Sequence, residues 1–275
     1  MNNLLDLLKA VCIGIIEGIT EWLPISSTGH MILADRFLKL GVSESFFEVF
    51  LVVIQLGAAL AVAVTYRKTL FPLELRRGAR PAIRRDCLAL WCKCLVACVP
   101  AAVIGLLFDE RLNELFYNST TVAAMLVFYG ILFIVVEKVR KGADKFGSAG
   151  DFTYRAALGV GLFQVLSLIP GTSRSGATIL GAMLLGASRG ASAEFSFFLA
   201  LPVMFGASAL KLAKFGFGFS QAEAAILLIG AATAFIVSLL AVKFLAGYVK
   251  KHDFTLFGAY RIVLGAAVLA LARLR

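Results

Sequence analysis

Apolar residues run through most of this 275-residue chain in long blocks that short polar stretches separate. A helix needs about 20 consecutive apolar residues to cross the hydrocarbon core of a membrane. Six blocks approach or reach this length and predict membrane-spanning helices at residues 46–66, 87–108, 118–138, 192–213, 222–245 and 256–273. The pattern therefore predicts an all-α polytopic membrane protein that forms a single membrane domain over residues 1–275.

Two further apolar stretches, residues 4–33 and 154–187, are each interrupted by a polar segment that contains glycine. The first break is residues 24–30 (PISSTGH) and the second is residues 170–176 (PGTSRSG). A helix, a break and a second helix predict a re-entrant hairpin. Irregular backbone at membrane depth is tolerated only where it is buried in protein or lines a wet cavity. Both breaks are therefore candidate functional sites.

The two breaks also align with each other. A shift of 147 positions places GIIE of residues 14–17 on GLFQ of residues 161–164, and SSTG of residues 26–29 on SRSG of residues 173–176. Each half of the chain then consists of one hairpin followed by three spans. The alignment predicts internal repeats at approximately residues 1–140 and 150–275.

The basic residues predict how these repeats are oriented. Arginine and lysine concentrate in the loops at residues 67–86 and 138–155, and positive loops face the cytoplasm. Two spans separate the loops, so both lie on the same side. Three spans in each half then invert the second repeat relative to the first, and the two broken tips can meet near the middle of the bilayer, as in other inverted-repeat membrane proteins.

Composition excludes other classes of protein. Charged residues make up 16% of the chain, whereas a soluble domain has about 25%. The net charge of +10 does not indicate a nucleic-acid partner, because the basic residues lie in short loops between apolar blocks. The expected surroundings are membrane lipids, and no nucleic acid is expected to bind.

The first break carries hydroxyl and imidazole groups, and the apolar stretch just before it carries two acidic groups. Glu17 and Glu21 lie four residues apart, so a helix places them on one face. Carboxylates at this depth are costly unless they meet a cation or water, which suggests a divalent metal site or a proton relay. Ser27 and His30 follow, and His30 can carry protons near neutral pH. The remaining residues of the turn predict an anion cradle at the start of the next helix: Ser26, Thr28 and Gly29.

The second break supplies a cation. Arg174 can hold phosphate oxygens through two parallel hydrogen bonds. Inside a bilayer it requires an anionic partner, which is a phosphate group or, at an empty site, Glu17 or Glu21. The hydroxyl and amide groups around it are also predicted to bind phosphate, and they belong to Thr172, Ser173, Ser175, Gly176 and Thr178.

Carboxylates, hydroxyls, a histidine and an arginine together suit phosphoryl transfer. That reaction requires neutralised charge on the transferring oxygens and an in-line nucleophile. The depth in the bilayer predicts a lipid phosphate as substrate, with its apolar tail held between spans. Glu48, Gln55 and Gln164 are further polar residues within apolar stretches, and we expect them to support the site.

The strings EGITEWLPISSTGH (residues 17–30) and PGTSRSGAT (residues 170–178) resemble the undecaprenyl-diphosphate phosphatases of the bacitracin-resistance type. EVFLVVIQLG (residues 48–57) and EFSFFLALP (residues 194–202) are similar to that family too, so the resemblance spans essentially the whole chain. It implies a bacterial inner-membrane enzyme that hydrolyses undecaprenyl diphosphate to undecaprenyl phosphate and inorganic phosphate. Such an enzyme recycles the carrier lipid for peptidoglycan synthesis and confers resistance to bacitracin.

The resemblance also implies a divalent metal ion, Mg²⁺ or Ca²⁺, and a site that opens toward the periplasm. Glu17 and Glu21 would hold the metal or polarise the attacking group, and Arg174 would grip the diphosphate. Ser27 is the candidate nucleophile, with His30 as acid or base. In a rival mechanism, water attacks directly and Ser27 only binds phosphate.

A second class of function stays open at this point. Inverted repeats with broken helices are also typical of transporters, and a lipid-phosphate flippase would need the same arginine and anion cradle. Phosphate release by purified protein in detergent separates the two classes, because transport needs a bilayer. The sequence does not determine the oligomeric state, the metal or the length of the lipid chain.

Overall fold

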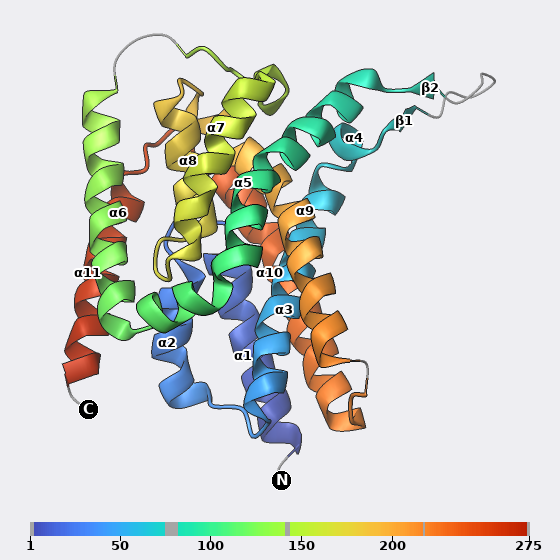
Figure 1. Cartoon of the computed structure of the whole chain (residues 1–275), viewed down its shortest axis with the longest axis vertical. Coiled ribbons are helices and arrows are strands. Elements are labelled where there is room, and N and C mark those ends of the chain that lie inside the picture. Colours follow the sequence, from blue (N-terminus) through green and yellow to red (C-terminus); the bar gives the residue numbers. More distant parts are fainter. Residues whose placement is uncertain (1–2, 75–81, 141–143, 217, 274–275) are drawn as a thin grey trace.

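The computed structural model describes residues 3–74, 82–140, 144–216 and 218–273. Residues 75–81 and 141–143 of the two basic loops lie outside this description. Helices dominate the described residues, and they run roughly alongside one another in one bundle (Figure 1). The described strands, β1 (Leu73–Glu74) and β2 (Ala82–Ile83), form a short antiparallel pair at one end of the bundle.

Six of the described helices are long and apolar enough to cross a membrane. They are α3 (Glu44–Thr65), α5 (Arg85–Phe116), α6 (Ser119–Val139), α9 (Arg189–Phe215), α10 (Gln221–Tyr248) and α11 (Thr255–Arg273). Each coincides with one predicted span, so the expectation of an all-α multi-pass membrane protein is confirmed. Two shorter elements, α4 (Arg67–Leu70) and η1 (Ala149–Asp151), lie in the connections.

The two interrupted stretches each form a helix, a turn and a second helix. The first consists of α1 (Asn3–Thr20) and α2 (Ser27–Leu38). The second consists of α7 (Tyr154–Val165), the 3₁₀ segment η2 (Leu166–Leu168) and α8 (Arg174–Leu184). We call residues 21–26 the first turn and residues 169–173 the second turn. That these hairpins are re-entrant in a bilayer stays a prediction.

Both turns are shorter than the predicted breaks, because a serine side chain starts the following helix early. The Ser26 hydroxyl accepts a hydrogen bond from the Gly29 amide at 3.4 Å, and the Ser173 hydroxyl accepts one from the Gly176 amide at 3.2 Å. Side chains of this kind satisfy the unpaired amides of a helix N-terminus. The predicted irregular segments 24–30 and 170–176 are therefore corrected: residues from Ser27 and from Arg174 onward are helical.

Each hairpin packs on a span from the other half of the chain. Helix α1 lies against α10, and α7 lies against α5. The contacts are close at equivalent glycines: a Cβ on Gly14 would lie 2.7 Å from the Gly230 carbonyl oxygen, and a Cβ on Gly161 would lie 2.5 Å from the Ala97 carbonyl oxygen. The internal repeat stays a prediction, and this reciprocal packing supports it.

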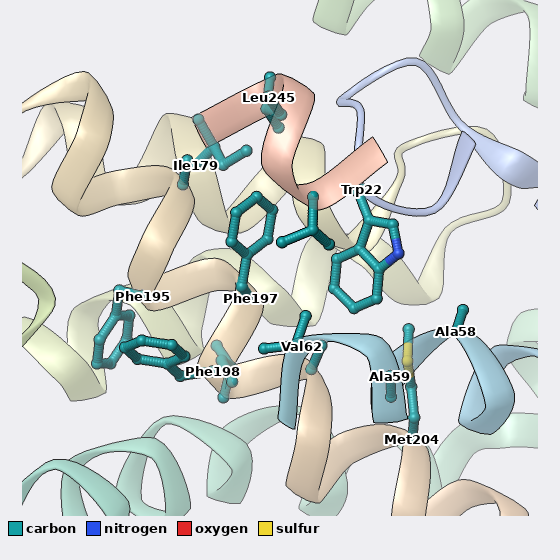
Figure 2. Packing of buried hydrophobic residues seen from close by; sticks show 14 of the residues in the cluster. Trp22, Ala58, Ala59, Val62, Ile179, Phe195, Phe197, Phe198, Met204 and Leu245 are labelled. Carbon is teal, nitrogen blue, oxygen red and sulfur yellow. The ribbon is translucent and has the colours of Figure 1, made fainter. Parts of the chain in front are cut away.

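Aromatic and aliphatic side chains pack the first turn against the core. Trp22 is fully buried, and its ring meets Phe197 of α9 edge-on with centroids 5.5 Å apart. Figure 2 shows Trp22 in one cluster with Val62 of α3, Phe197 and Leu245 of α10. The turn is thus held by helices from both halves of the chain, which fixes the position of the polar residues beside it.

The close contact at Gly161 predicts a stability difference between two glycine variants. Gly161→Ala should lower the melting temperature in detergent, since overpacking a tight contact costs about 1–3 kcal/mol. A Cβ on Gly206 of α9 would have no atom within 4 Å, so Gly206→Ala is the matched control. Alanine there should leave stability unchanged or raise it, because alanine favours a helix over glycine by roughly 1 kcal/mol. Equal melting temperatures would contradict the packing of α7 on α5.

Candidate active site

The two turns lie next to each other, and a buried arginine joins them. Arg261 of α11 has no exposed surface. Its guanidinium donates to the carbonyl oxygen of Pro24 in the first turn at 3.1 Å, and to those of Gly171 and Thr172 in the second turn at 2.8 and 2.9 Å. The expected meeting of the two tips is therefore present in the structure.

A second contact between the two hairpins is an ion pair. Arg174 Nη2 lies 2.9 Å from Oε1 of Glu21, and the two side chains are 11% and 7% exposed. Arg174 Nη1 also donates to the carbonyl oxygen and the hydroxyl of Ser196 on α9, at 2.7 and 3.2 Å. Of the two carboxylates expected as alternative partners of Arg174, the structure selects Glu21.

The same carboxylate binds the candidate nucleophile. The Ser27 hydroxyl donates to Oε2 of Glu21 at 3.2 Å, so Glu21 lies between Ser27 and Arg174. A carboxylate bonded to a hydroxyl is placed to accept its proton. Glu17 lies one helical turn earlier with 1% of its surface exposed, and its Oε1 has no hydrogen-bond partner among the described residues. The cluster thus retains one buried carboxylate oxygen for a ligand.

His30 is placed differently from the expected acid or base beside Ser27. Its Nδ1 lies 2.7 Å from the Ser26 carbonyl oxygen, and its Nε2 lies 2.8 Å from the hydroxyl of Tyr260 on α11. A carbonyl oxygen can only accept, so Nδ1 donates to it. The described hydrogen bond of Ser27 goes to Glu21 instead. Glu21 is therefore the better-placed proton acceptor for Ser27.

The starts of α2 and α8 present amide groups to the same region. The first amides of any helix have no acceptor within the helix, and here Ser26 and Ser173 already occupy the amides of Gly29 and Gly176. The predicted amide cradle is therefore narrower than expected and consists of the first two residues of each helix. Both capping serines have positive φ, 74° and 71°, which is strained for a residue other than glycine and is typical of functional sites.

Besides the two capping serines, two more hydroxyls of the predicted phosphate-binding set are bonded within the protein. Ser175 donates to the carbonyl oxygen of Glu21 at 3.0 Å, which ties the start of α8 to the first turn. Thr178 donates to the Arg174 carbonyl oxygen at 2.9 Å, and its hydroxyl lies 2.7 Å from that of Ser196. These residues hold the cluster in place, so the hydroxyls that remain as candidates for direct phosphate contact are those of Thr28 and Thr172.

The expected supporting residues lie elsewhere. Glu48 pairs with Lys211 at 2.6 Å, and its side chain is 57% exposed, so its expected place beside the site is corrected. Gln164 is buried against α5, where its amide donates to the Ala97 carbonyl oxygen at 3.4 Å. Gln55 is half-buried in α3, and none of the described hydrogen bonds involves it. None of the three has a described contact with the Arg174–Glu21–Ser27 cluster.

Three residues of the site were missed by sequence reasoning. Arg261 and Tyr260 lie inside a span, where a single arginine or tyrosine is often a residue of the membrane interface. Ser196 is a small polar residue in an apolar helix and carries no motif. The one available signal was the cost of a charge within a span, which marks Arg261 as a residue that needs buried partners.

Fold and site together define a class: a multi-pass membrane protein whose two helical hairpins bring a carboxylate, a hydroxyl and a guanidinium into one buried cluster. The chain belongs to the family described as bacitracin resistance protein BacA, whose model matches residues 10–267. This confirms the resemblance seen in the sequence.

Several relatives are similar over nearly the full length. The chain is 57% identical over 268 residues to the undecaprenyl-diphosphatase of Desulfitobacterium hafniense, an alignment that covers 97% of this chain and 96% of the relative. It is 54% identical over 268 residues to the undecaprenyl-diphosphatase of Enterococcus faecalis, with 97% of both covered. The undecaprenyl-diphosphatase of Streptococcus thermophilus is 52% identical over 270 residues, which cover 97% of this chain and 93% of the relative.

Proposed function

We propose that this chain is an integral membrane phosphatase that hydrolyses undecaprenyl diphosphate to undecaprenyl phosphate and inorganic phosphate. The observation that carries the proposal is the buried cluster in which Glu21 contacts both Arg174 and Ser27. It combines a phosphate-binding cation, a hydroxyl and a proton acceptor. The product returns to the pool of carrier lipid for peptidoglycan synthesis, and the family description names bacitracin resistance.

Substrate binding begins with an exchange of partners at Arg174. In the structure, the guanidinium is bonded to Glu21. A diphosphate offers oxygens that match the guanidinium fork, and the free amides at the starts of α2 and α8 add donors for the same anion. As Arg174 turns to phosphate, Glu21 becomes free to accept a proton from Ser27. The ion pair compensates both charges in the structure, and phosphate oxygens would take over this role at Arg174.

In the mechanism that this geometry favours, Ser27 Oγ attacks the terminal phosphorus while Glu21 takes the hydroxyl proton. A bond forms between Oγ and phosphorus, and the bond from phosphorus to the bridging oxygen breaks. Undecaprenyl phosphate leaves with that oxygen, and water then hydrolyses the phosphoserine. In the rival mechanism, water attacks the phosphorus directly, Glu21 accepts its proton, and Ser27 only binds phosphate.

A divalent ion, Mg²⁺ or Ca²⁺, fits this donor set. Glu17 Oε1 is buried without a hydrogen-bond partner among the described residues, and such ions prefer carboxylate oxygens. Glu17 and Glu21 are the residues that would hold the ion, and the described residues contain no group of three acidic, histidine or cysteine ligands. The bound ion supplies charge neutralisation at the phosphate oxygens. Chelation by EDTA should abolish phosphate release and added Mg²⁺ should restore it; activity that persists in EDTA would contradict a metal site.

The proposed location is the bacterial inner membrane, with the site open to the periplasm. Helix α1 begins and α2 ends at the lower end of the bundle in Figure 1, opposite the end that carries α4 and the strands. Basic residues flank α4 and the strands, as expected for a cytoplasmic face. In the proposed orientation, the first hairpin enters from the periplasmic side, where a lipid diphosphate in the outer leaflet would meet it.

Phosphate release in detergent tests the proposed activity. Purified protein is expected to release inorganic phosphate from undecaprenyl diphosphate in micelles, where a flippase would do nothing. The printed names of the relatives are those of a phosphatase, so a flippase is not favoured. Glu48→Gln is the matched control and should keep the wild-type rate, because Glu48 pairs with Lys211 outside the site. Folded wild-type protein that releases no phosphate with Mg²⁺ or Ca²⁺ present would overturn the proposal.

A further inference from the structure

The contact between Tyr260 and His30 has no part in the mechanism above. The Tyr260 hydroxyl lies 2.8 Å from His30 Nε2, and the two rings are nearly parallel, with an interplanar angle of 8° and centroids 5.6 Å apart. His30 Nδ1 lies 2.7 Å from the Ser26 carbonyl oxygen. Since Nδ1 must donate to that carbonyl, Nε2 of a neutral ring accepts, and the Tyr260 hydroxyl is the donor.

The position of Tyr260 is fixed by the residue that follows it. Arg261 is fully buried and donates to carbonyl oxygens of both turns, so this part of α11 cannot shift without breaking those bonds. Tyr260 itself is 44% exposed. Its hydroxyl therefore reaches His30 from the edge of the site, where α11 packs against α2.

We propose that Tyr260 is a positioning residue for phosphate release and acts through His30. The proposal rests on the proposed phosphatase function. The hydroxyl holds the imidazole in one orientation and one tautomer. In that tautomer, the Nδ1–H group donates to the Ser26 carbonyl oxygen, and Nε2 accepts from the Tyr260 hydroxyl. His30 lies three residues after Ser27, on the same side of the first turn of α2, so the orientation of its ring bears on the region where the diphosphate binds. Partners that fix a histidine tautomer act in this way in other enzymes.

Tyr260→Phe tests this role, because it removes the hydroxyl and keeps the ring. We expect kcat to fall about tenfold, the effect of one lost hydrogen bond, with KM within about twofold and an unchanged melting temperature. In a His30→Ala background the same change should have no further effect, since a residue that acts through His30 cannot act without it. Tyr154→Phe, at an exposed position at the start of α7, is the control and should match wild type.

A spectroscopic measurement tests the tautomer without relying on activity. The chain has two histidines, so ¹⁵N-histidine labelling gives two sets of ring signals, and His252→Gln assigns them. The His30 signals should show one tautomer, protonated at Nδ1, in wild type and a mixture in Tyr260→Phe. Unchanged His30 signals, wild-type kcat in Tyr260→Phe, or an equal fall in the His30→Ala background would each overturn the proposal. A wild type that releases no phosphate would instead overturn the phosphatase function on which it rests.

Discussion

Replacing Arg174 by alanine is expected to lower kcat/KM for undecaprenyl diphosphate by roughly 10³-fold. Charged donors aimed at a transferring phosphoryl group contribute about 10³ to 10⁵ in rate in other phosphoryl-transfer enzymes. Arg174 is nearly buried. Its Nη2 lies 2.9 Å from Oε1 of Glu21, and its Nη1 donates to the Ser196 carbonyl oxygen, so contacts on two sides orient its guanidinium. Initial rates of phosphate release in detergent, over a range of substrate concentrations, measure the effect.

Two controls separate catalysis from folding in this experiment. Arg174→Lys keeps the charge but loses the fork that binds two oxygens, and should fall between wild type and Arg174→Ala. Removing Arg174 also leaves Glu21 buried without its cation, which costs roughly 3–5 kcal/mol of stability in buried pairs. The double variant Glu21→Gln with Arg174→Ala removes the unpaired charge and provides a folded reference. A folded Arg174→Ala protein that keeps more than a tenth of wild-type kcat/KM would contradict the site.

Ser27→Ala is expected to reduce kcat by roughly 10³-fold or more, since loss of a nucleophile in comparable covalent enzymes costs several powers of ten. The physical reason is the hydrogen bond of the Ser27 hydroxyl to Glu21 Oε2 at 3.2 Å, which positions both the nucleophile and its proton acceptor. Acid quenching during turnover, followed by mass spectrometry of the peptide that contains residue 27, should detect phosphoserine.

Ser45 provides the control for this second experiment, because it lies at the exposed start of α3, where its hydroxyl faces Ser43. Ser45→Ala should turn over like wild type, and no phosphate should appear on Ser45. If Ser27→Ala keeps good turnover and no phosphoserine forms, water attacks directly and Ser27 is only a ligand of the phosphate. The role of Arg174 would survive that result, whereas the covalent mechanism would not.

Much of the fold follows from the apolar pattern alone. A span must hold about 20 apolar residues because the bilayer sets its length, and α3, α6 and α10 begin and end within a few residues of their predicted ranges. The hairpins follow from polar breaks within two apolar stretches. The residues at which α2 and α8 begin cannot be predicted from the apolar pattern. The sequence does not reveal that Ser26 and Ser173 cap the next helix rather than extend the break.

The candidate site also has residues that the sequence predicts and residues that it does not. Glu21, Ser27 and Arg174 are recognisable because a polar group in an apolar stretch is costly and so demands a partner. The choice of Glu21 over Glu17 as that partner depends on side-chain geometry, which a helical face does not resolve. Arg261 and Tyr260 are separated from the first turn by more than 200 positions, and only the packing of α11 brings them there. Glu48 is equally polar, yet it lies near an end of its helix and pairs with Lys211.

The most direct test of the account is an experimental structure with a polyprenyl diphosphate analogue in which a methylene group replaces the bridging oxygen. We expect the terminal phosphonate to lie between the two hairpins, within hydrogen-bond distance of the Arg174 guanidinium and the Ser27 hydroxyl, with the apolar tail between helices. An analogue bound elsewhere, with Arg174 still paired to Glu21 and no phosphonate oxygen near Ser27, would contradict a single phosphate site built from both hairpins.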